Sequence, residues 1–129
     1  MNDRKSKAIE NKKCGKCNCC QAVICAYCDK VNISEEMAMN LGKAFAAGMG
    51  STEGTCGALV GAGVVLGLMN KDKAETIKMM RNVMNGFQEK NGAVHCKQLK
   101  EKSIDCNACV VDVADFLDNI LHNEVQNEN

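Results

Sequence analysis

Apolar residues recur at spacings of three and four along most of this chain, and no proline interrupts them. That period is typical of α-helices, whereas the alternation of β-branched residues that marks strands is scarce. The sequence therefore predicts an all-α fold, and 129 residues are enough for one domain with one core. We expect a single bundle of about five to six helices.

The predicted helices follow the apolar pattern and its interruptions. Ser34 is a plausible N-cap for the second helix, which should end at Gly48 to Gly50, and Asn70 is expected to cap the fourth. Met37 and Ile77 are expected to face the core. The expected helices cover about 19–30, 34–48, 56–69, 70–89 and 106–121, with a short sixth around 96–99.

The segment at about 56–69 is the predicted centre of the fold, because it leaves almost no polar surface. It also carries four glycines, each of which costs up to about 1 kcal/mol in a helix relative to alanine. That cost makes sense where neighbouring helices, or a cofactor, approach the backbone closely. The glycines are Gly57, Gly61, Gly63 and Gly67.

The two ends of the chain are polar, although the formal net charge is zero. We expect residues 1–17 to form a basic, flexible arm, residues 18–122 the cysteine-rich helical domain, and residues 123–129 a frayed tail. No patterned basic face or aromatic platform predicts nucleic-acid binding.

No apolar segment follows the charged amino terminus as a secretory signal would require, and no run approaches the roughly 20 apolar residues of a membrane span. We therefore expect no membrane association and a cytoplasmic location. In that reducing compartment, metal binding or redox cycling is a commoner use of cysteine than a disulfide framework.

The chemistry of this chain is expected to lie in its ten cysteines. Thiolates bind iron–sulfur clusters and zinc, and they are also the nucleophiles of disulfide exchange. Cys56 follows a glycine-rich loop and stands where a helix should begin, and the dipole at such a position stabilises a thiolate. Three pairs have C-x-x-C spacing, namely Cys14/Cys17, Cys25/Cys28 and Cys106/Cys109.

Four of these cysteines stand in local patterns that resemble the C-GCAxxG-C-C family of redox-active proteins, over about residues 19–121. The family pattern is matched by Cys20-Gln-Ala-Val23, by Gly54-Thr-Cys56-Gly-Ala58 with Gly61, by Cys96-Lys-Gln-Leu99, and by Cys106 with Val110, Val113 and Ala114. Six further cysteines have no counterpart in that pattern.

The resemblance implies a small helical redox protein, and a similar domain occurs in split-Soret cytochromes, which carry an iron–sulfur centre. On that analogy we expect an iron–sulfur cluster, 2Fe–2S by preference, that passes electrons to a partner protein. The resemblance is as compatible with an electron carrier as with an enzyme, and it also allows a homodimer. The expected ligands are Cys20, Cys56, Cys96 and Cys106, beside Gly57 and Gly61, with Cys14, Cys17 and Cys109 as secondary candidates.

Two other functions remain open at this point. One is a thiol–disulfide oxidoreductase, in which Cys56 attacks and Cys106 or Cys20 resolves the mixed disulfide. Cys109, one turn after Cys106, is a further candidate for a resolving thiol or an alternative ligand. The other is a zinc-stabilised structural or metal-sensing module, because four cysteines suit zinc as readily as iron.

Overall fold

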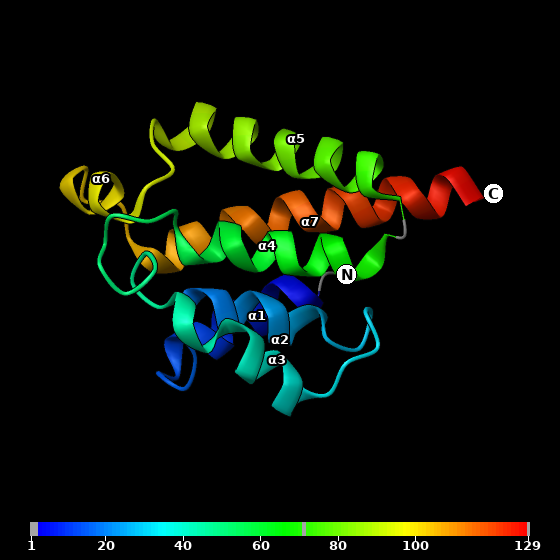
Figure 1. Cartoon of the computed structure of the whole chain (residues 1–129), viewed down its shortest axis with the longest axis horizontal. Helices are drawn as coiled ribbons and strands as arrows, with labels where there is room; N and C mark the ends of the chain where they lie inside the picture. The colour runs from blue at the N-terminus through cyan, green and yellow to red at the C-terminus, as the bar shows by residue number, and fades with distance from the viewer. Residues whose placement is uncertain (1–2, 71, 129) are drawn as a thin grey trace.

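The computed structural model describes residues 3–70 and 72–128, with side chains for 4–70 and 72–122. In this part of the chain the helices are joined by turns and loops (Figure 1). Within those ranges the only β-type pairing is an isolated bridge between Thr55 and His95. The all-α prediction is confirmed, with more helices than expected. The elements are α1 (Asp3–Lys13), α2 (Cys19–Tyr27), α3 (Glu35–Gly42), a 3-10 turn η1 (Lys43–Phe45), α4 (Gly57–Met69), α5 (Lys73–Asn91), α6 (Cys96–Glu101) and α7 (Cys106–Glu128).

The centre of the bundle is shared between α2 and α4. Helix α2 contacts α1, α3, α4 and α7, and every residue from Cys20 to Tyr27 is buried. Helix α4 matches the predicted central helix, but its main contacts are with α2, α5 and α7, and Gly67 and Leu68 are exposed. Its glycine-rich sequence thus marks a close helix pair rather than a fully enclosed helix.

The segment that we expected to be a flexible arm forms helix α1 over Asp3–Lys13 and packs against α2 and α7. Arg4 donates hydrogen bonds to the carbonyl oxygen of Ala26 (3.3 Å) and to Asp29 Oδ2 (2.9 Å), and its guanidinium lies 5.7 Å from the centre of the Tyr27 ring. Ala8 is completely buried. The polar composition of this segment gave no apolar pattern, because polar side chains such as Arg4 and Lys5, which pairs with Asp115 (2.8 Å), make much of the contact with α2 and α7.

Local capping decides where α3 and α5 begin. Ser34 Oγ accepts a hydrogen bond from the Met37 N–H (3.0 Å), which confirms the predicted N-cap. Asn70 was predicted to cap α5, but its side chain instead donates to Leu66 O at the end of α4 (3.0 Å). Asp72 is the N-cap of α5 and accepts from Ala74 N–H (3.1 Å).

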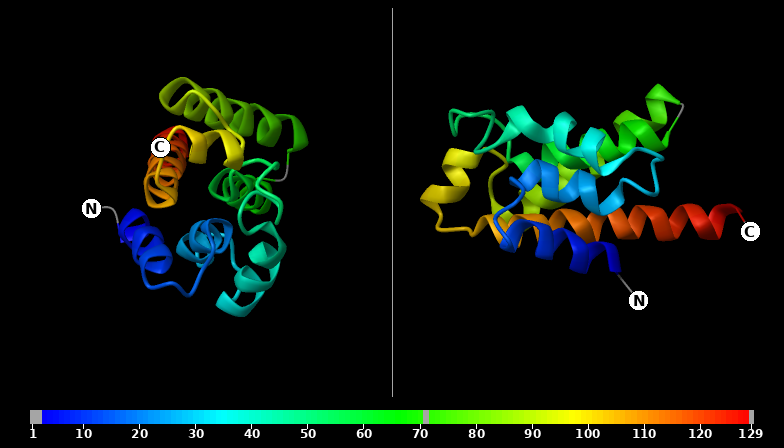
Figure 2. Two further views of the ribbon diagram at one scale, coloured as in Figure 1. Left: turned by 90° about the vertical axis from the view of Figure 1, so that its left-hand side faces the viewer. Right: turned by 90° about the horizontal axis from the view of Figure 1, so that it is seen from below.

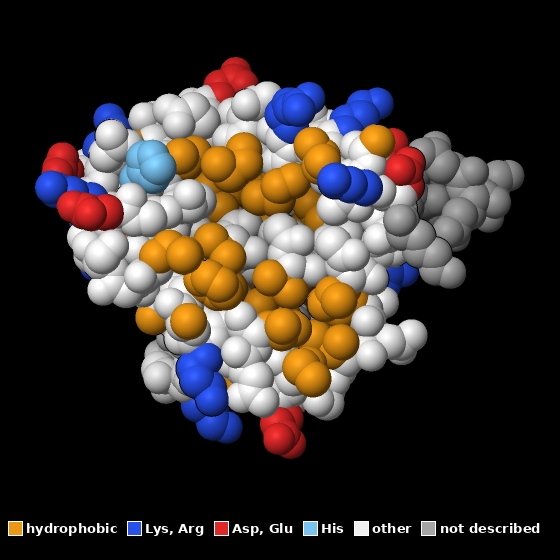
Figure 3. Space-filling model, in the orientation of Figure 1, with side chains coloured by type: hydrophobic (Ala, Val, Ile, Leu, Met, Phe, Trp, Pro, Cys, Tyr) orange, Lys and Arg blue, Asp and Glu red, His pale blue; other side chains and the backbone are white. Residues whose placement is uncertain are grey.

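Two residues predicted to face the core are on the surface. Met37 is 49 % exposed and Ile77 is 47 % exposed. Helix α3 lies at the edge of the bundle against α2, so its outer face meets solvent. Figure 3 shows apolar side chains gathered on this face of the molecule, over α3, α4 and α5. Within the described residues, no helix combines the length and apolar character that crossing a membrane requires.

The last helix of the bundle extends past the expected domain boundary at residue 122. Helix α7 begins at Cys106, as predicted, and its backbone continues to Glu128. The side chains of the expected frayed tail, 123–129, lie outside the described residues.

Candidate thiol site

Four helices begin at the same end of the bundle, and each brings a cysteine there. Figures 1 and 2 show the starts of α2, α4, α6 and α7 together at the end opposite the carboxyl terminus. Cys20 lies in the first turn of α2, Cys56 is the N-cap of α4, and Cys96 and Cys106 are the first residues of α6 and α7. The four cysteines that carry the family resemblance therefore share one end of the fold.

Two further thiols lie among them. Cys109, in the first turn of α7, lies close enough to Cys56 that hydrogen bonding between the two thiols is the largest influence on the pKa of each. Cys106 likewise acts on the pKa of Cys19, after burial. We call these six residues the first thiol cluster: Cys19, Cys20, Cys56, Cys96, Cys106 and Cys109.

Cys56 is the one thiol of this cluster whose pKa is lowered, to about 7. The hydrogen bond from Cys109 is the largest cause, and the N–H groups of Ala58 and Leu59 act in the same direction, against the effect of burial. The sulfur makes no full capping hydrogen bond to these N–H groups, so they act mainly as dipoles at the start of α4. The hydrogen bond also raises the pKa of Cys109, which keeps its proton.

Three other thiols of the cluster favour the protonated form. Burial, followed by the nearby Cys56, raises the pKa of Cys20 to about 12. Burial, followed by Cys106 and Cys56, does the same for Cys19, and burial also raises the pKa of Cys96. Together with Cys109, these thiols surround the one sulfur whose pKa is lowered.

The cluster as it stands does not have the geometry of a metal site. In the described part of the chain, no three His, Cys, Asp or Glu side chains come together so that they could hold a metal ion. The predicted ligands Cys20, Cys56, Cys96 and Cys106 share one end of the bundle but do not converge on a point. An iron–sulfur cluster or a zinc ion would need these side chains to move closer.

Gly57 and Gly61 have a packing role between α4 and α2. A Cβ atom on Gly61 would lie 2.9 Å from Cys20 O and 3.0 Å from Val23 Cβ, and one on Gly57 would lie 2.9 Å from Phe45 O. The close approach of α4 to the backbone of α2, and at Gly57 also to that of η1, therefore accounts for both glycines. That they also leave room for a cofactor stays a prediction.

The loop between η1 and α4 ties the start of α6 to that of α4. Thr52 O and Gly54 O accept hydrogen bonds from the N–H groups of Lys97 (2.7 Å) and Cys96 (2.9 Å). The Cys56 N–H in turn donates to Val94 O (2.8 Å). These bonds satisfy N–H groups that a helix start leaves free, and they hold Cys56 and Cys96 near each other.

We expect Gly48→Ala to lower the free energy of unfolding by about 2–5 kcal/mol, because the new Cβ would overlap Cys96 Cβ and because Gly48 has a positive φ of 64°. The matched control is Gly50→Ala, which has a φ of 82° but open space around its Cβ, and should lose only about 1–2 kcal/mol. Urea denaturation measures both. Equal losses for the two variants would contradict the contact with Cys96.

The remaining four cysteines lie outside this cluster. Cys14 and Cys17 stand in the turn after α1, and Cys25 and Cys28 lie at the end of α2. The secondary candidates Cys14 and Cys17 are therefore not brought to Cys56, whereas Cys109 is. Sequence reasoning missed Cys109 as the direct partner of Cys56, and its spacing of three from Cys106 was the available signal.

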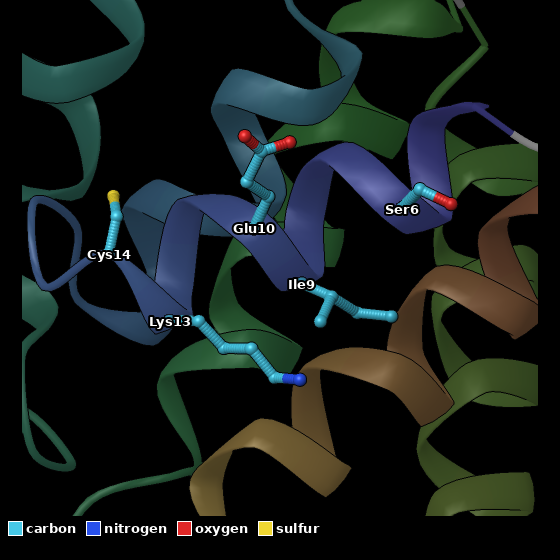
Figure 4. A pocket seen from close by; sticks show the side chains of 5 residues that line it. All are labelled: Ser6, Ile9, Glu10, Lys13 and Cys14. Carbon is cyan, nitrogen blue, oxygen red and sulfur yellow. The ribbon is translucent and has the colours of Figure 1, made fainter.

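A surface pocket of about 480 Å³ lies on α1 and the turn after it. Figure 4 shows Ile9 and Lys13 pointing to the side of α1 on which α7 lies, while Glu10 and Cys14 point the other way. The pocket contains no residue of the first thiol cluster. Its lining is Ser6, Ile9, Glu10, Lys13 and Cys14.

Fold and site together define a small all-helical protein with thiols gathered where four of its helices begin. The family model described as "Putative redox-active protein (C_GCAxxG_C_C)" matches residues 17–120, so the chain belongs to this redox-active family. No curated protein and no solved structure matches the chain. The family resemblance predicted from the sequence is confirmed.

Proposed function

We propose that this protein is a thiol–disulfide oxidoreductase in which Cys56 is the attacking sulfur and Cys109 the resolving thiol. The observation that carries the proposal is the position of the Cys109 thiol beside the Cys56 sulfur at the start of α4, where hydrogen bonding between the two lowers the pKa of Cys56. A pKa of about 7 leaves roughly half of Cys56 as thiolate at neutral pH. The resolving role thus goes to Cys109 rather than to Cys106 or Cys20.

The reaction begins when the Cys56 thiolate attacks one sulfur of a partner disulfide. The partner S–S bond breaks, its other sulfur leaves as a thiolate that takes up a proton, and a mixed disulfide with Cys56 forms. Cys109 then loses its proton to solvent and attacks the Cys56 sulfur, which releases the second partner thiol. Two electrons pass to the partner, and the protein retains a Cys56–Cys109 disulfide that a dithiol reductant returns to the starting state.

Burial restricts which partners can reach this pair. Cys56 is 6 % exposed and Cys109 is 2 % exposed. A slim disulfide, either of a small molecule or on an extended protein loop, fits this access better than a disulfide on a flat surface. In a reducing compartment such as the cytoplasm the dithiol form is the resting state.

The test is exposure of the reduced protein to a small disulfide such as oxidised glutathione, followed by peptide mapping without reduction. In the wild type we expect an internal Cys56–Cys109 link. In Cys109→Ala we expect glutathione to stay attached to Cys56, because the resolving thiol is missing. Glutathione attached mainly to other cysteines in both proteins would overturn the proposal.

A second proposal is binding of an iron–sulfur cluster by Cys20, Cys56, Cys96 and Cys106, with electron transfer to a partner protein. The placement of all four at helix starts on one end favours it. Anaerobic purification followed by iron, sulfide and zinc analysis distinguishes cluster binding from a zinc-stabilised module and from disulfide exchange. Iron and labile sulfide lost in Cys20→Ser would favour the cluster, stoichiometric zinc in a colourless protein would favour the structural module, and a metal-free protein leaves disulfide exchange.

A further inference from the structure

A second group of sulfur atoms lies outside the first thiol cluster and has no part in the proposed exchange. The thiol of Cys17, in the turn after α1, donates a hydrogen bond to Met39 on α3, with Sγ and Sδ 3.6 Å apart. Cys25, on α2, belongs to the small core cluster against which Met39 packs, and it lies close enough to Cys17 for each thiol to act on the pKa of the other. Three sulfur atoms from three separate segments are therefore neighbours.

The surroundings of these three sulfurs are apolar on one side and open on the other. Cys25 is 6 % exposed and belongs to a small core cluster with Ile24 and Ala38, against which Met39 packs. Cys17 and Met39 are half-buried. An ion could therefore reach the group from the Cys17 side and be shielded from water on the Cys25 side.

The donor set selects a soft ion. Two thiols and one thioether supply only sulfur, which prefers Cu(I) to the hard cations that oxygen ligands bind. Zinc in structural sites takes four ligands. The sequence offers four in the pairs Cys14/Cys17 and Cys25/Cys28, but no three metal-binding side chains of the His, Cys, Asp or Glu types converge among the described residues.

The position of Cys14 supports the three-sulfur set. Its side chain is exposed, and its thiol donates to Asn11 O (3.3 Å) within the turn after α1. The group of neighbouring sulfurs thus consists of Cys17 from the first C-x-x-C pair, Cys25 from the second pair, and Met39. The four cysteines of the two pairs do not form such a group by themselves.

We propose that Cys17, Cys25 and Met39 form a binding site for Cu(I). Binding replaces the two S–H hydrogens, so two protons leave for one Cu(I), and two thiolate bonds and one thioether bond form. The oxidation state of the metal and of the sulfurs does not change. The first thiol cluster takes no part in this site.

The test uses the reduced full-length protein with ¹³C-labelled methionine methyl groups, titrated without oxygen with Cu(I) as its acetonitrile complex. We expect the Met39 methyl resonance, assigned with Met39→Leu, to shift on binding, and the shift to be lost in Cys17→Ser and in Cys25→Ala. The methyl resonances of the other methionines report whether each variant is folded. This local signal is independent of copper that binds at the first thiol cluster.

Met37→Leu is the matched control, because Met37 lies on the same helix but is exposed and has no thiol contact. It should leave the Met39 shift unchanged. In competition with a Cu(I) chelator, Met39→Leu should weaken this site by at least about tenfold, since loss of even an outer-shell partner of a metal typically costs about 10–100-fold.

Three outcomes would overturn the proposal. The first is a Met39 resonance that does not move while copper binds elsewhere. The second is a shift that persists in Cys17→Ser, which would mean that the thiols are not ligands. The third is binding that needs Cys14 and Cys28 but not Met39, which is the signature of a four-thiolate site.

Discussion

Gly61→Ala is expected to lower the free energy of unfolding by about 1–3 kcal/mol, because the added methyl group would press on the backbone of α2. The nearest atom is Cys20 O at 2.9 Å, and a helix carbonyl oxygen cannot move away without moving the helix. The gain in helix propensity of alanine over glycine, up to about 1 kcal/mol, offsets only part of this cost.

Gly67→Ala is the matched variant on the same helix. No atom lies within 4 Å of a Cβ built there, so the propensity gain should stand alone and raise stability by about 0.5–1 kcal/mol. Urea denaturation of the two variants measures the difference in sign. A Gly61→Ala protein at least as stable as the wild type would refute the close contact between α2 and α4.

Cys109→Ala is expected to move the pKa of Cys56 upward from about 7 toward the ordinary thiol value of 9.0, since the Cys109 hydrogen bond is the largest cause of the lowered value. The thiolate fraction of Cys56 grows as pH rises through its pKa, so the midpoint of its alkylation rate should move upward with it. At pH 7 the rate should fall by only about fivefold, because a thiolate of higher pKa is a better nucleophile.

The measurement is the rate of iodoacetamide labelling at Cys56 from pH 5 to pH 10, followed by peptide mass spectrometry. Cys106→Ala is the control, because Cys106 lies on the same helix but makes no contribution to the lowered pKa of Cys56. Its profile should keep a midpoint near 7. Identical midpoints for Cys109→Ala and the wild type would mean that the start of α4, and not Cys109, activates the sulfur.

The sequence predicted those features of the fold that depend on neighbouring residues. Ser34 with two glutamates after it specifies the start of α3, and Gly92, with a φ of 77°, ends α5 close to the predicted end at about residue 89. The start of α5 was misplaced by two residues. Asn70 and Asp72 are both good N-caps, and only the packing of α4 assigns Asn70 to its end.

Features that depend on packing were less predictable. Helix α1 is mostly polar, so no apolar period marked it, and its contacts depend on Arg4 reaching Asp29 across 25 residues. Met37 and Ile77 continue apolar stripes in sequence, but both side chains lie on the outer sides of α3 and α5 and are about half exposed.

The same distinction holds for the site. A glycine-rich loop before Cys56 was enough to place that sulfur at a helix start. Its pairing with Cys109 depends on how α4 and α7 lie against each other, and the contact of Cys17 with Met39 depends on the packing of α3 on α2. The spacing of Cys109 from Cys106 marks Cys109 as a candidate but does not pair it with Cys56, and no cysteine spacing points to Met39.

Four helices begin at one end of the bundle, and each has a cysteine there. The position of each sulfur therefore does not depend on how many residues lie between the cysteines in sequence. Cys20 and Cys56 are located by the docking of α2 on α4, and the turn that leads from α2 into α3 lies at the opposite end (Figure 1). Residues added to that turn, or to the one between α4 and α5, would lengthen the chain at the end away from the first thiol cluster. Sequences with very different intervals between their cysteines can therefore build the same arrangement.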